Sequence, residues 1–279
     1  MPVPGRAQDL APVPFEVSAM DVVDAMLGIA GVGPKDFVVD LGSGDGRIVI
    51  RAATKYGARG FGVEIDAKLV TLSNNKARAA GVADRARFVV QDLFKTDIAR
   101  ASVVTMFLSR QLNLAMRSRL LAELAPGSRV VSHDHDMGTW KPDRELNLIP
   151  EAERRAHFDR EHQRESWIYL WIVPARIGGT WRGRVAGDGA TLEITFNQKF
   201  QVISGVARWH GKSALIAPKL RGTGISFDVM AEAQGPRRSF KGRIEGDVIT
   251  GTVRSGAART AGTPAWRLDR VRRRGARKR

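Results

Sequence analysis

Cysteine is absent from the 279-residue sequence, and no apolar run is long. Without cysteine the chain has no disulfide framework, no thiolate metal site and no covalent mechanism on a cysteine nucleophile. The longest apolar runs, such as residues 167–174, fall short of the roughly 20 residues that a membrane helix needs. Residues 1–18 also lack the charged start and apolar core of a signal peptide. We therefore predict a cytoplasmic protein without a transmembrane segment.

Positive charge is concentrated in the last third of the chain. Residues 1–175 carry 23 basic and 22 acidic side chains, whereas residues 176–279 carry 22 basic and 7 acidic ones, a net charge of +15. This asymmetry predicts a first domain over residues 1–175, a basic all-β accessory domain over 176–270 and a basic disordered tail over 271–279. A basic domain attracts polyanions, so weak contact of residues 176–279 with nucleic acid or an anionic membrane is one interpretation. The other interpretation is that the positive charge only keeps this domain soluble.

The first domain has the pattern of an α/β protein. Short β-branched runs alternate with helical stretches of about 10 to 15 residues, which implies right-handed crossovers and a doubly wound, Rossmann-like parallel sheet. The predicted strands are 37–41, 60–65, 87–90, 102–108 and 128–132, and two later strands, 146–149 and 167–173, complete the sheet. The predicted helices are 47–56, 67–80 and 112–124, after a leading helix with an apolar face between Val22 and Ala30.

The pattern changes after residue 175. Seven short alternating runs with glycine-rich turns lie between residues 180 and 271. This spacing predicts a small antiparallel β barrel or sandwich.

A glycine-rich turn follows the first predicted strand, in the segment Asp40-Leu41-Gly42-Ser43-Gly44-Asp45-Gly46. Glycines at this place let the backbone approach a ligand closely. The segment fails as a dinucleotide fingerprint because the third glycine would be needed at position 47, and its spacing suits a ligand with an amino-acid portion. Glu64 ends the second strand, where a carboxylate can bind ribose hydroxyls, and Asp92 follows the third, where it can accept from an adenine amino group.

These residues, with Leu93 and Phe94, resemble the class I S-adenosylmethionine-dependent methyltransferases. Residues 22–27, 40–50, 60–66 and 132–138 more closely resemble the protein-lysine methyltransferases of the mitochondrial ATP-synthase c subunit and adenine-nucleotide carrier, and their bacterial relatives. The resemblance covers about residues 13–174. It implies that the cofactor is S-adenosyl-L-methionine, with the glycines around its methionine end, Glu64 at its ribose and Asp92 with Leu93 at its adenine. The predicted cofactor-binding residues are Asp40, Gly42, Ser43, Gly44, Gly46, Glu64, Ile65, Asp92 and Leu93.

The sequence departs from this family at two places. The family's Val-Pro-Thr-Pro segment is replaced by Glu16-Val17-Ser18-Ala19, and its Asp-Phe-Asp is Asp134-His135-Asp136. Alternation along an extended segment places His133 and His135 on one face and the two acids on the other, so we predict no metal site. Orienting the substrate, forming the rim of the cofactor site and capping a strand are the alternatives for the acids. A lysine acceptor must lose a proton, and we predict Asp134 first and Asp136 second as the catalytic carboxylates.

Three functions remain open. The leading one is methylation of a protein substrate at lysine, which rests on the resemblance. The second is an RNA methyltransferase whose basic C-terminal domain holds nucleic acid. This interpretation is weakened by the lack of cysteine, which pyrimidine-C5 methylation requires, and of an Asn/Asp-Pro-Pro-Tyr/Phe element after the fourth strand. The third is a catalytically idle binding module.

Overall fold

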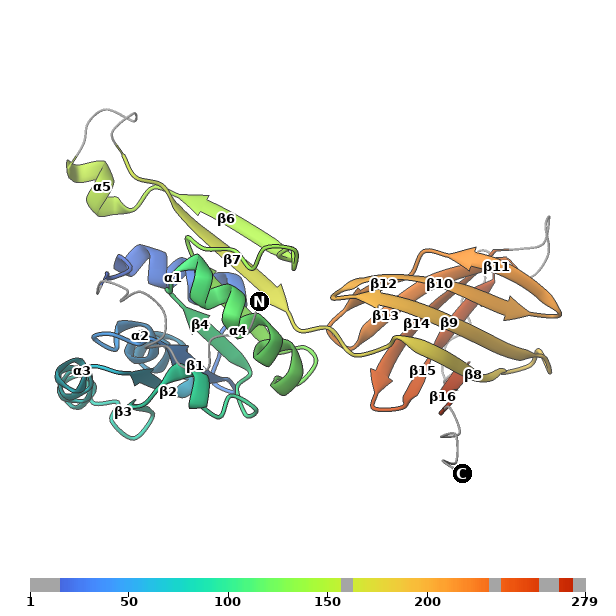
Figure 1. The fold of residues 1–279 in the computed structure, drawn as a ribbon, viewed down its shortest axis with the longest axis horizontal. Helices are drawn as coiled ribbons and strands as arrows, with labels where there is room; N and C mark the ends of the chain where they lie inside the picture. The colour runs from blue at the N-terminus through green and yellow to red at the C-terminus, as the bar shows by residue number, and fades with distance from the viewer. Residues whose placement is uncertain (1–15, 157–162, 231–236, 256–265, 273–279) are drawn as a thin grey trace, which may run out of the picture. The chain divides into compact units, whose positions relative to one another are not determined.

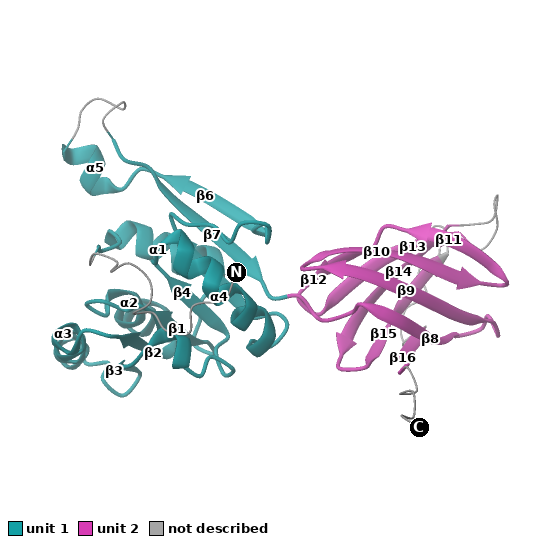
Figure 2. Cartoon of the chain, in the orientation of Figure 1, with its two compact units in different colours: residues 1–173 teal, residues 174–279 magenta. Residues whose placement is uncertain are grey.

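The structure, a computed structural model, describes residues 16–156, 163–230, 237–255 and 266–272. It divides into two compact units, residues 1–173 and 174–279 (Figure 2). The sequence prediction placed this division after Ala175. The predicted tail lies outside the described residues except for Val271 and Arg272. No helix in the described part of the chain is both long enough and apolar enough to cross a membrane.

The first unit is built on a seven-stranded sheet with the order β3-β2-β1-β4-β5-β7-β6 (Figure 1). Strands β1 to β5 are parallel, which confirms the predicted Rossmann-like arrangement. Strand β7, whose direction the sequence did not predict, runs antiparallel to both β5 and β6. Between β6 and β7 the described residues form the six-residue helix α5, which has no buried residue, so no apolar helix among them packs on the sheet between these two strands. The strands are β1 Phe37–Leu41, β2 Arg59–Glu64, β3 Ala86–Val90, β4 Val103–Met106, β5 Arg129–His133, β6 Arg144–Leu148 and β7 Ser166–Ile172.

Helices α1 to α4 cover this sheet because each buries apolar residues on one face. The buried residues of α1, Val22, Val23, Met26 and Leu27, pack in one cluster with residues of α2 and of β1, β4, β5 and β7. This packing fixes the segment before α1 next to the ends of the central strands. The helices are α1 Met20–Ala30, α2 Arg47–Tyr56, α3 Ala67–Ala79, η2 Leu93–Lys95, α4 Arg110–Glu123 and α5 Glu151–Ala156.

The second unit is one nine-stranded antiparallel sheet, in the order β11-β10-β9-β8-β16-β15-β14-β13-β12. It rolls into a barrel: β16 pairs with β8, and β10 and β11 lie in contact with β12 and β13. Its two end strands, β11 and β12, are consecutive in the chain. Buried aromatic rings, among them Trp181, Trp209, Phe227, Phe240 and Trp266, fill the interior. The strands are β8 Gly179–Val185, β9 Thr191–Lys199, β10 Val202–Trp209, β11 Lys212–Ile216, β12 Lys219–Arg221, β13 Gly224–Met230, β14 Arg237–Glu245, β15 Val248–Ser255 and β16 Trp266–Arg270.

Candidate active site

The glycine-rich turn between β1 and α2 has a backbone that only glycine adopts readily. Gly42, Gly44 and Gly46 have φ angles of 77°, 52° and 82°. A β-carbon on Gly46 would lie 2.6 Å from the Phe88 ring, and one on Gly42 would lie 2.7 Å from Leu108. Gly42 and Gly46 therefore have no room for a side chain.

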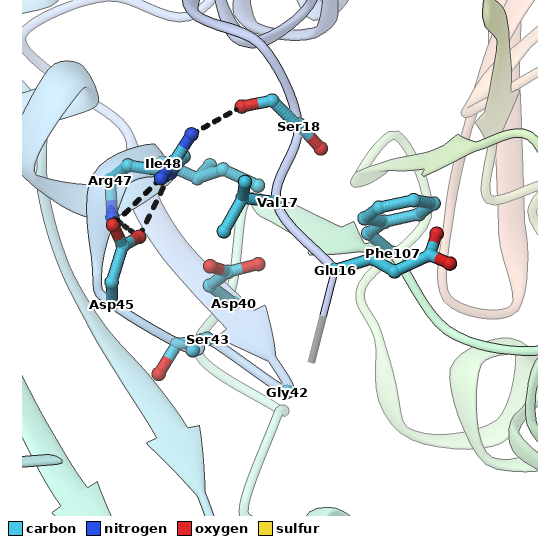
Figure 3. A pocket seen from close by; sticks show the side chains of 11 residues that line it. Glu16, Val17, Ser18, Asp40, Gly42, Ser43, Asp45, Arg47, Ile48 and Phe107 are labelled. Atoms are coloured by element: carbon cyan, nitrogen blue, oxygen red, sulfur yellow. Dashed lines mark hydrogen bonds and ion pairs between the residues drawn. The ribbon is translucent and has the colours of Figure 1, made fainter. Parts of the chain in front are cut away.

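An open pocket lies on this turn. The segment of residues 16–18 and the Phe107 ring form its other walls (Figure 3). The buried Ser43 hydroxyl, one of its lining groups, has no hydrogen-bond partner among the described residues. The full lining is Glu16, Val17, Ser18, Asp40, Gly42, Ser43, Gly44, Asp45, Arg47, Ile48 and Phe107.

Asp40 lies at the base of the pocket and is 1% exposed. Its Oδ1 accepts a 2.7 Å hydrogen bond from the Thr105 hydroxyl on β4. Burial raises the pKa of Asp40 to about 7 despite this hydrogen bond, and the nearby carboxylates of Glu64 and Asp45 raise it further. Asp40 is therefore a carboxyl group that a cationic ligand can ionise at neutral pH.

Asp45 connects the turn to the segment before α1. Arg47 donates Nε and Nη2 to Asp45 at 2.9 and 2.8 Å, and its Nη1 donates to the Ser18 carbonyl at 2.8 Å. Lys76 Nζ donates to Asp45 at 2.7 Å. Burial opposes the charge of Asp45, but the hydrogen bonds from Arg47 and Lys76 lower its pKa to about 2. The sequence prediction did not include this ion-pair cluster, although Asp45 stands inside the motif.

Glu64 reaches the glycine turn from the end of β2. Its Oε2 accepts from the Gly44 amide at 3.1 Å, and its Oε1 accepts from the amides of Ile65 and Asp66 at 2.7 and 3.2 Å. The structure thus brings Glu64 and Ile65 next to the turn, although they are not among the residues that line the pocket.

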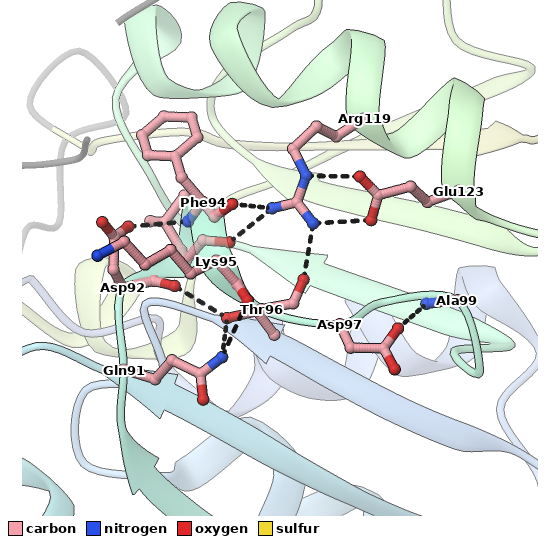
Figure 4. Close-up of polar contacts among 10 residues, drawn as sticks. Gln91, Asp92, Phe94, Lys95, Thr96, Asp97, Ala99, Arg119 and Glu123 are labelled. Carbon is pink, nitrogen blue, oxygen red and sulfur yellow. Dashed lines mark hydrogen bonds and ion pairs between the residues drawn. The ribbon is translucent and has the colours of Figure 1, made fainter. Parts of the chain in front are cut away.

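The loop after β3 holds Asp92 and Leu93. Asp92 Oδ1 accepts from the Phe94 amide at 2.8 Å and caps η2. The Arg119 guanidinium of α4 donates to the carbonyls of Leu93, Phe94 and Thr96 and forms an ion pair with Glu123 (Figure 4). Arg119 was not predicted, because nothing local in the sequence connects it to this loop.

Neither Asp134 nor Asp136 lines the pocket. Asp134 has a φ of 58°, and its Oδ1 accepts from the Trp167 amide of β7 at 2.8 Å. Asp136 Oδ1 accepts from the Gly138 amide at 3.0 Å and from Arg110 Nε at 3.1 Å, and these contacts lower its pKa. Both acids therefore stabilise the loop after β5. Within the described residues, no group of three or more His, Cys, Asp or Glu side chains is arranged to hold a metal ion.

His133 connects the pocket wall to Asp134. Its Nδ1 lies 2.9 Å from the Ser18 hydroxyl, its Nε2 lies 3.5 Å from Asp134 Oδ2, and its ring centroid is 4.1 Å from that of Phe107. Burial lowers the pKa of His133 below its usual range, although Asp134 opposes this shift. From the sequence, His133 and its neighbours were considered as metal ligands, as the rim of the cofactor site or as a structural cap, and the contact of His133 with Ser18 was not predicted. The sequence signal that could have identified its role was a histidine at the end of a strand.

Comparison with known proteins identifies the family. A family model described as the ANTKMT methyltransferase domain matches residues 40–144. A protein-lysine N-methyltransferase of Saccharolobus islandicus is 41% identical over 131 residues, which cover 47% of this chain and 81% of that protein. The chain belongs to the protein-lysine methyltransferase family. The resemblance seen in the sequence is thereby confirmed.

Other proteins similar to this methyltransferase carry names with different methyl acceptors. The adenine nucleotide translocase lysine N-methyltransferase of Mus musculus is 36% identical over 141 residues, which cover 50% of this chain and 59% of that protein. A solved structure described as an RNA methyltransferase from Salinibacter ruber, in complex with S-adenosyl-L-homocysteine, is 45% identical with a TM-score of 0.51. The match covers 58% of this chain and 96% of the Salinibacter ruber chain.

The protein is a class I methyltransferase that uses S-adenosyl-L-methionine, and the residues present fit this cofactor. Positive φ angles at Gly42, Gly44 and Gly46 let the backbone of the turn approach a ligand, and the Ser43 hydroxyl beside it has no hydrogen-bond partner among the described residues. Asp40 offers a buried carboxyl to a cationic group. When bound, S-adenosyl-L-methionine supplies an electrophilic methyl group for in-line displacement, so this chain must mainly orient the acceptor and exclude water.

Proposed function

We propose that this methyltransferase transfers methyl groups to lysine side chains of a protein substrate. The relative from Saccharolobus islandicus, with 81% of its length covered, supports this acceptor. The pocket supports it as well, because Glu16 and the Phe107 ring both line it and an acid beside an aromatic face suits an ammonium group. The cytoplasmic location remains a prediction from the sequence.

The predicted cofactor residues are proposed to act as a set. Asp40, Ser43 and the glycines hold the methionine end of the cofactor, because they surround the pocket base. Glu64 binds the ribose from the adjoining end of β2, and Ile65 lies beside it. Asp92 and Leu93 border the adenine, on a loop that Arg119 holds in place.

The observation that carries the lysine proposal is the chain of contacts from Ser18 through His133 to Asp134. A lysine ammonium, with a pKa of about 10, must lose a proton before its nitrogen can attack. The Ser18 hydroxyl accepts this proton and passes its own to Nδ1 of the neutral His133 ring, which becomes imidazolium. Asp134 stabilises that cation from the Nε2 side. In this proposal Asp134 is a positioning residue behind the pocket. Asp136, which is held by Arg110 and Gly138, remains the second candidate for the carboxylate that assists proton removal.

The test is transfer of tritiated methyl groups from S-adenosyl-L-methionine into a cell lysate, divided between protease and nuclease digestion before counting. Label released only by protease supports the proposal. Label released by nuclease favours the RNA alternative, which the name of the Salinibacter ruber structure supports. Cofactor binding with no transfer to either fraction supports the idle binding module.

Asp134→Asn tests the proton path separately. We expect turnover to fall about 100-fold or more while cofactor affinity stays unchanged, since general acid–base groups contribute at least this much. The pH profile of kcat should also lose the limb that reports His133. Asp136→Asn is the matched control in the same loop, with a smaller effect on turnover. Equal losses of turnover and cofactor affinity in Asp134→Asn would assign Asp134 a structural role only.

A further inference from the structure

Exposed aliphatic side chains gather on the outer face of the barrel. Val202 is 69% exposed, Val206 is 42% exposed and Leu215 is 88% exposed. Val206 of β10 and Leu215 of β11 stand directly opposite each other in the strand pairing. Burial alternates strictly along β10, so Val202 and Val206 point outward together while Ile203 points inward. We call Val202, Val206 and Leu215 the β10–β11 patch.

Unpaired cations surround this patch. Lys199 stands opposite Val202 in the pairing of β9 with β10, and Arg208 and Lys212 lie on the patch's own strands. Lys219 and Arg221 are on β12, the strand that follows β11. These side chains are exposed, and none forms an ion pair with another described residue.

The remainder of the barrel differs, because its arginines are mostly neutralised. On β8 and β14 to β16 and just beyond, carboxylates of the barrel form ion pairs with Arg182, Arg237, Arg238, Arg243, Arg267, Arg270 and Arg272. In the strand order, β16 is farthest from the β11 and β12 ends of the sheet. The unneutralised charge therefore concentrates around the exposed aliphatic groups.

The combination of exposed aliphatic side chains with unneutralised cations distinguishes between two kinds of polyanionic partner, single-stranded RNA and an anionic lipid surface. Proteins that hold single-stranded RNA present aromatic rings on which bases stack. Among the described phenylalanine and tryptophan rings of this barrel, Trp181, Trp209, Trp266 and three phenylalanines are instead buried in its interior, and Phe200 alone is partly exposed. Exposed leucine and valine side chains beside lysines suit the boundary between lipid headgroups and acyl chains, where apolar groups enter and cations contact phosphates.

We propose that the β10–β11 patch docks the second unit on an anionic lipid bilayer. Leu215, Val202 and Val206 enter the headgroup boundary, and the surrounding lysines and arginines contact the lipid phosphates. The proposal concerns localisation and does not depend on which acceptor the methyltransferase domain modifies.

The experiment is flotation of the full chain with phosphatidylcholine vesicles that contain or lack phosphatidylserine. We expect binding only to the anionic vesicles, decreasing as salt rises. Leu215→Ser combined with Val206→Ser should weaken binding about tenfold, because two inserted apolar side chains are lost. Lys199→Gln combined with Lys212→Gln should weaken it by a similar factor and reduce its salt dependence.

Matched controls isolate the patch. Lys241→Gln combined with Arg254→Gln removes two exposed cations of β14 and β15 that form no ion pair with another described residue. Val271→Ser removes an aliphatic side chain that is 41% exposed. Both should bind vesicles like the wild type. Every variant keeps residues 273–279, so the charge of that segment is constant.

Thermal unfolding and cofactor binding of each variant confirm an intact fold. Absence of flotation by the wild type overturns the proposal. Flotation that Leu215→Ser with Val206→Ser leaves unchanged also overturns it. Binding of a generic RNA that depends on the same cations, without vesicle binding, would assign the surface to nucleic acid instead.

Discussion

The buried carboxyl of Asp40 predicts a pH-dependent loss of stability that Asp40→Asn removes. Burial raises its pKa from 3.8 to about 7. This difference of about 3 pKa units corresponds to about 4 kcal/mol, at about 1.36 kcal/mol for each unit. The folded state keeps the proton up to about pH 7, whereas the unfolded state loses it near pH 4. The contribution of Asp40 to stability is therefore complete below pH 4 and disappears as pH rises to 7.

The asparagine amide has nearly the same size and can accept the Thr105 hydroxyl without ionising. In urea unfolding, we expect Asp40→Asn to gain up to about 4 kcal/mol relative to the wild type between about pH 4 and about pH 8. Thr105→Val removes the hydrogen bond that lowers the pKa of Asp40, so it should enlarge the wild-type loss. Identical pH dependence in the wild type and Asp40→Asn would refute the reasoning.

Cofactor binding gives a second measurement of the same group. The amino group of S-adenosyl-L-methionine is cationic and favours ionised Asp40, so binding to the wild type should release a proton. Affinity should then rise as pH approaches 7, by at most about tenfold for each pH unit. Calorimetry in buffers of different ionisation enthalpy measures the released proton, and Asp40→Asn should release none.

Three further substitutions test the turn. Glu64→Ala should weaken S-adenosyl-L-methionine binding by about 1–3 kcal/mol in calorimetry, because charge-assisted hydrogen bonds are lost; equal affinity would contradict the ribose assignment. Gly46→Ala should cost at least about 1–2 kcal/mol of stability, since its φ is 82° and its β-carbon would meet Phe88 at 2.6 Å. The control Gly28→Ala, in α1 with nothing within 4 Å, should not destabilise, and similar melting temperatures for the two variants would contradict the prediction. Asp45→Asn should cost about 2 kcal/mol at neutral pH and progressively less as pH falls from about 4 to 2, because the folded pKa is about 2; a cost that does not change with pH would be evidence against the ion-pair cluster.

Local patterns predicted most of the first sheet. The apolar runs of β1 to β5 and the glycines that follow them are short-range signals. The start of α4 was placed two residues late, at Leu112, because Ser109 caps the helix through its hydroxyl, which accepts from the Leu112 amide at 3.3 Å. The orientation of β7 depends on hydrogen bonds to β5 and β6 that no local pattern contains.

The distinction between local sequence patterns and long-range contacts also applies to the second unit and to the candidate site. Alternating runs predict antiparallel strands, but a barrel and a sandwich share this alternation. The pairing of β16 with β8 joins the strands into one sheet, and the contacts of β10 with β12 and of β11 with β13 bring its two ends together. The glycine turn and Glu64 could be predicted because their roles depend on strand ends. The contact of Ser18 with His133 joins residues 115 positions apart, and Asp134 meets the Trp167 amide 33 positions later. Only the folded chain brings these partners together.

Asp40 and Asp45 show how cationic partners reverse the effect of burial on the charge of an acid in this pocket. The two residues are 1% and 5% exposed, and both line the same pocket. Among the described residues, the hydrogen-bond partner of Asp40 is the neutral Thr105 hydroxyl, and the pKa of Asp40 rises to about 7. Asp45 has Arg47 and Lys76 as partners, and its pKa falls to about 2. The charge of Asp45 is therefore already neutralised and serves to hold the segment of residues 16–18 through Arg47. Asp40 is left as the buried acid whose ionisation a cationic ligand can change, so a proton released on cofactor binding should come from this residue.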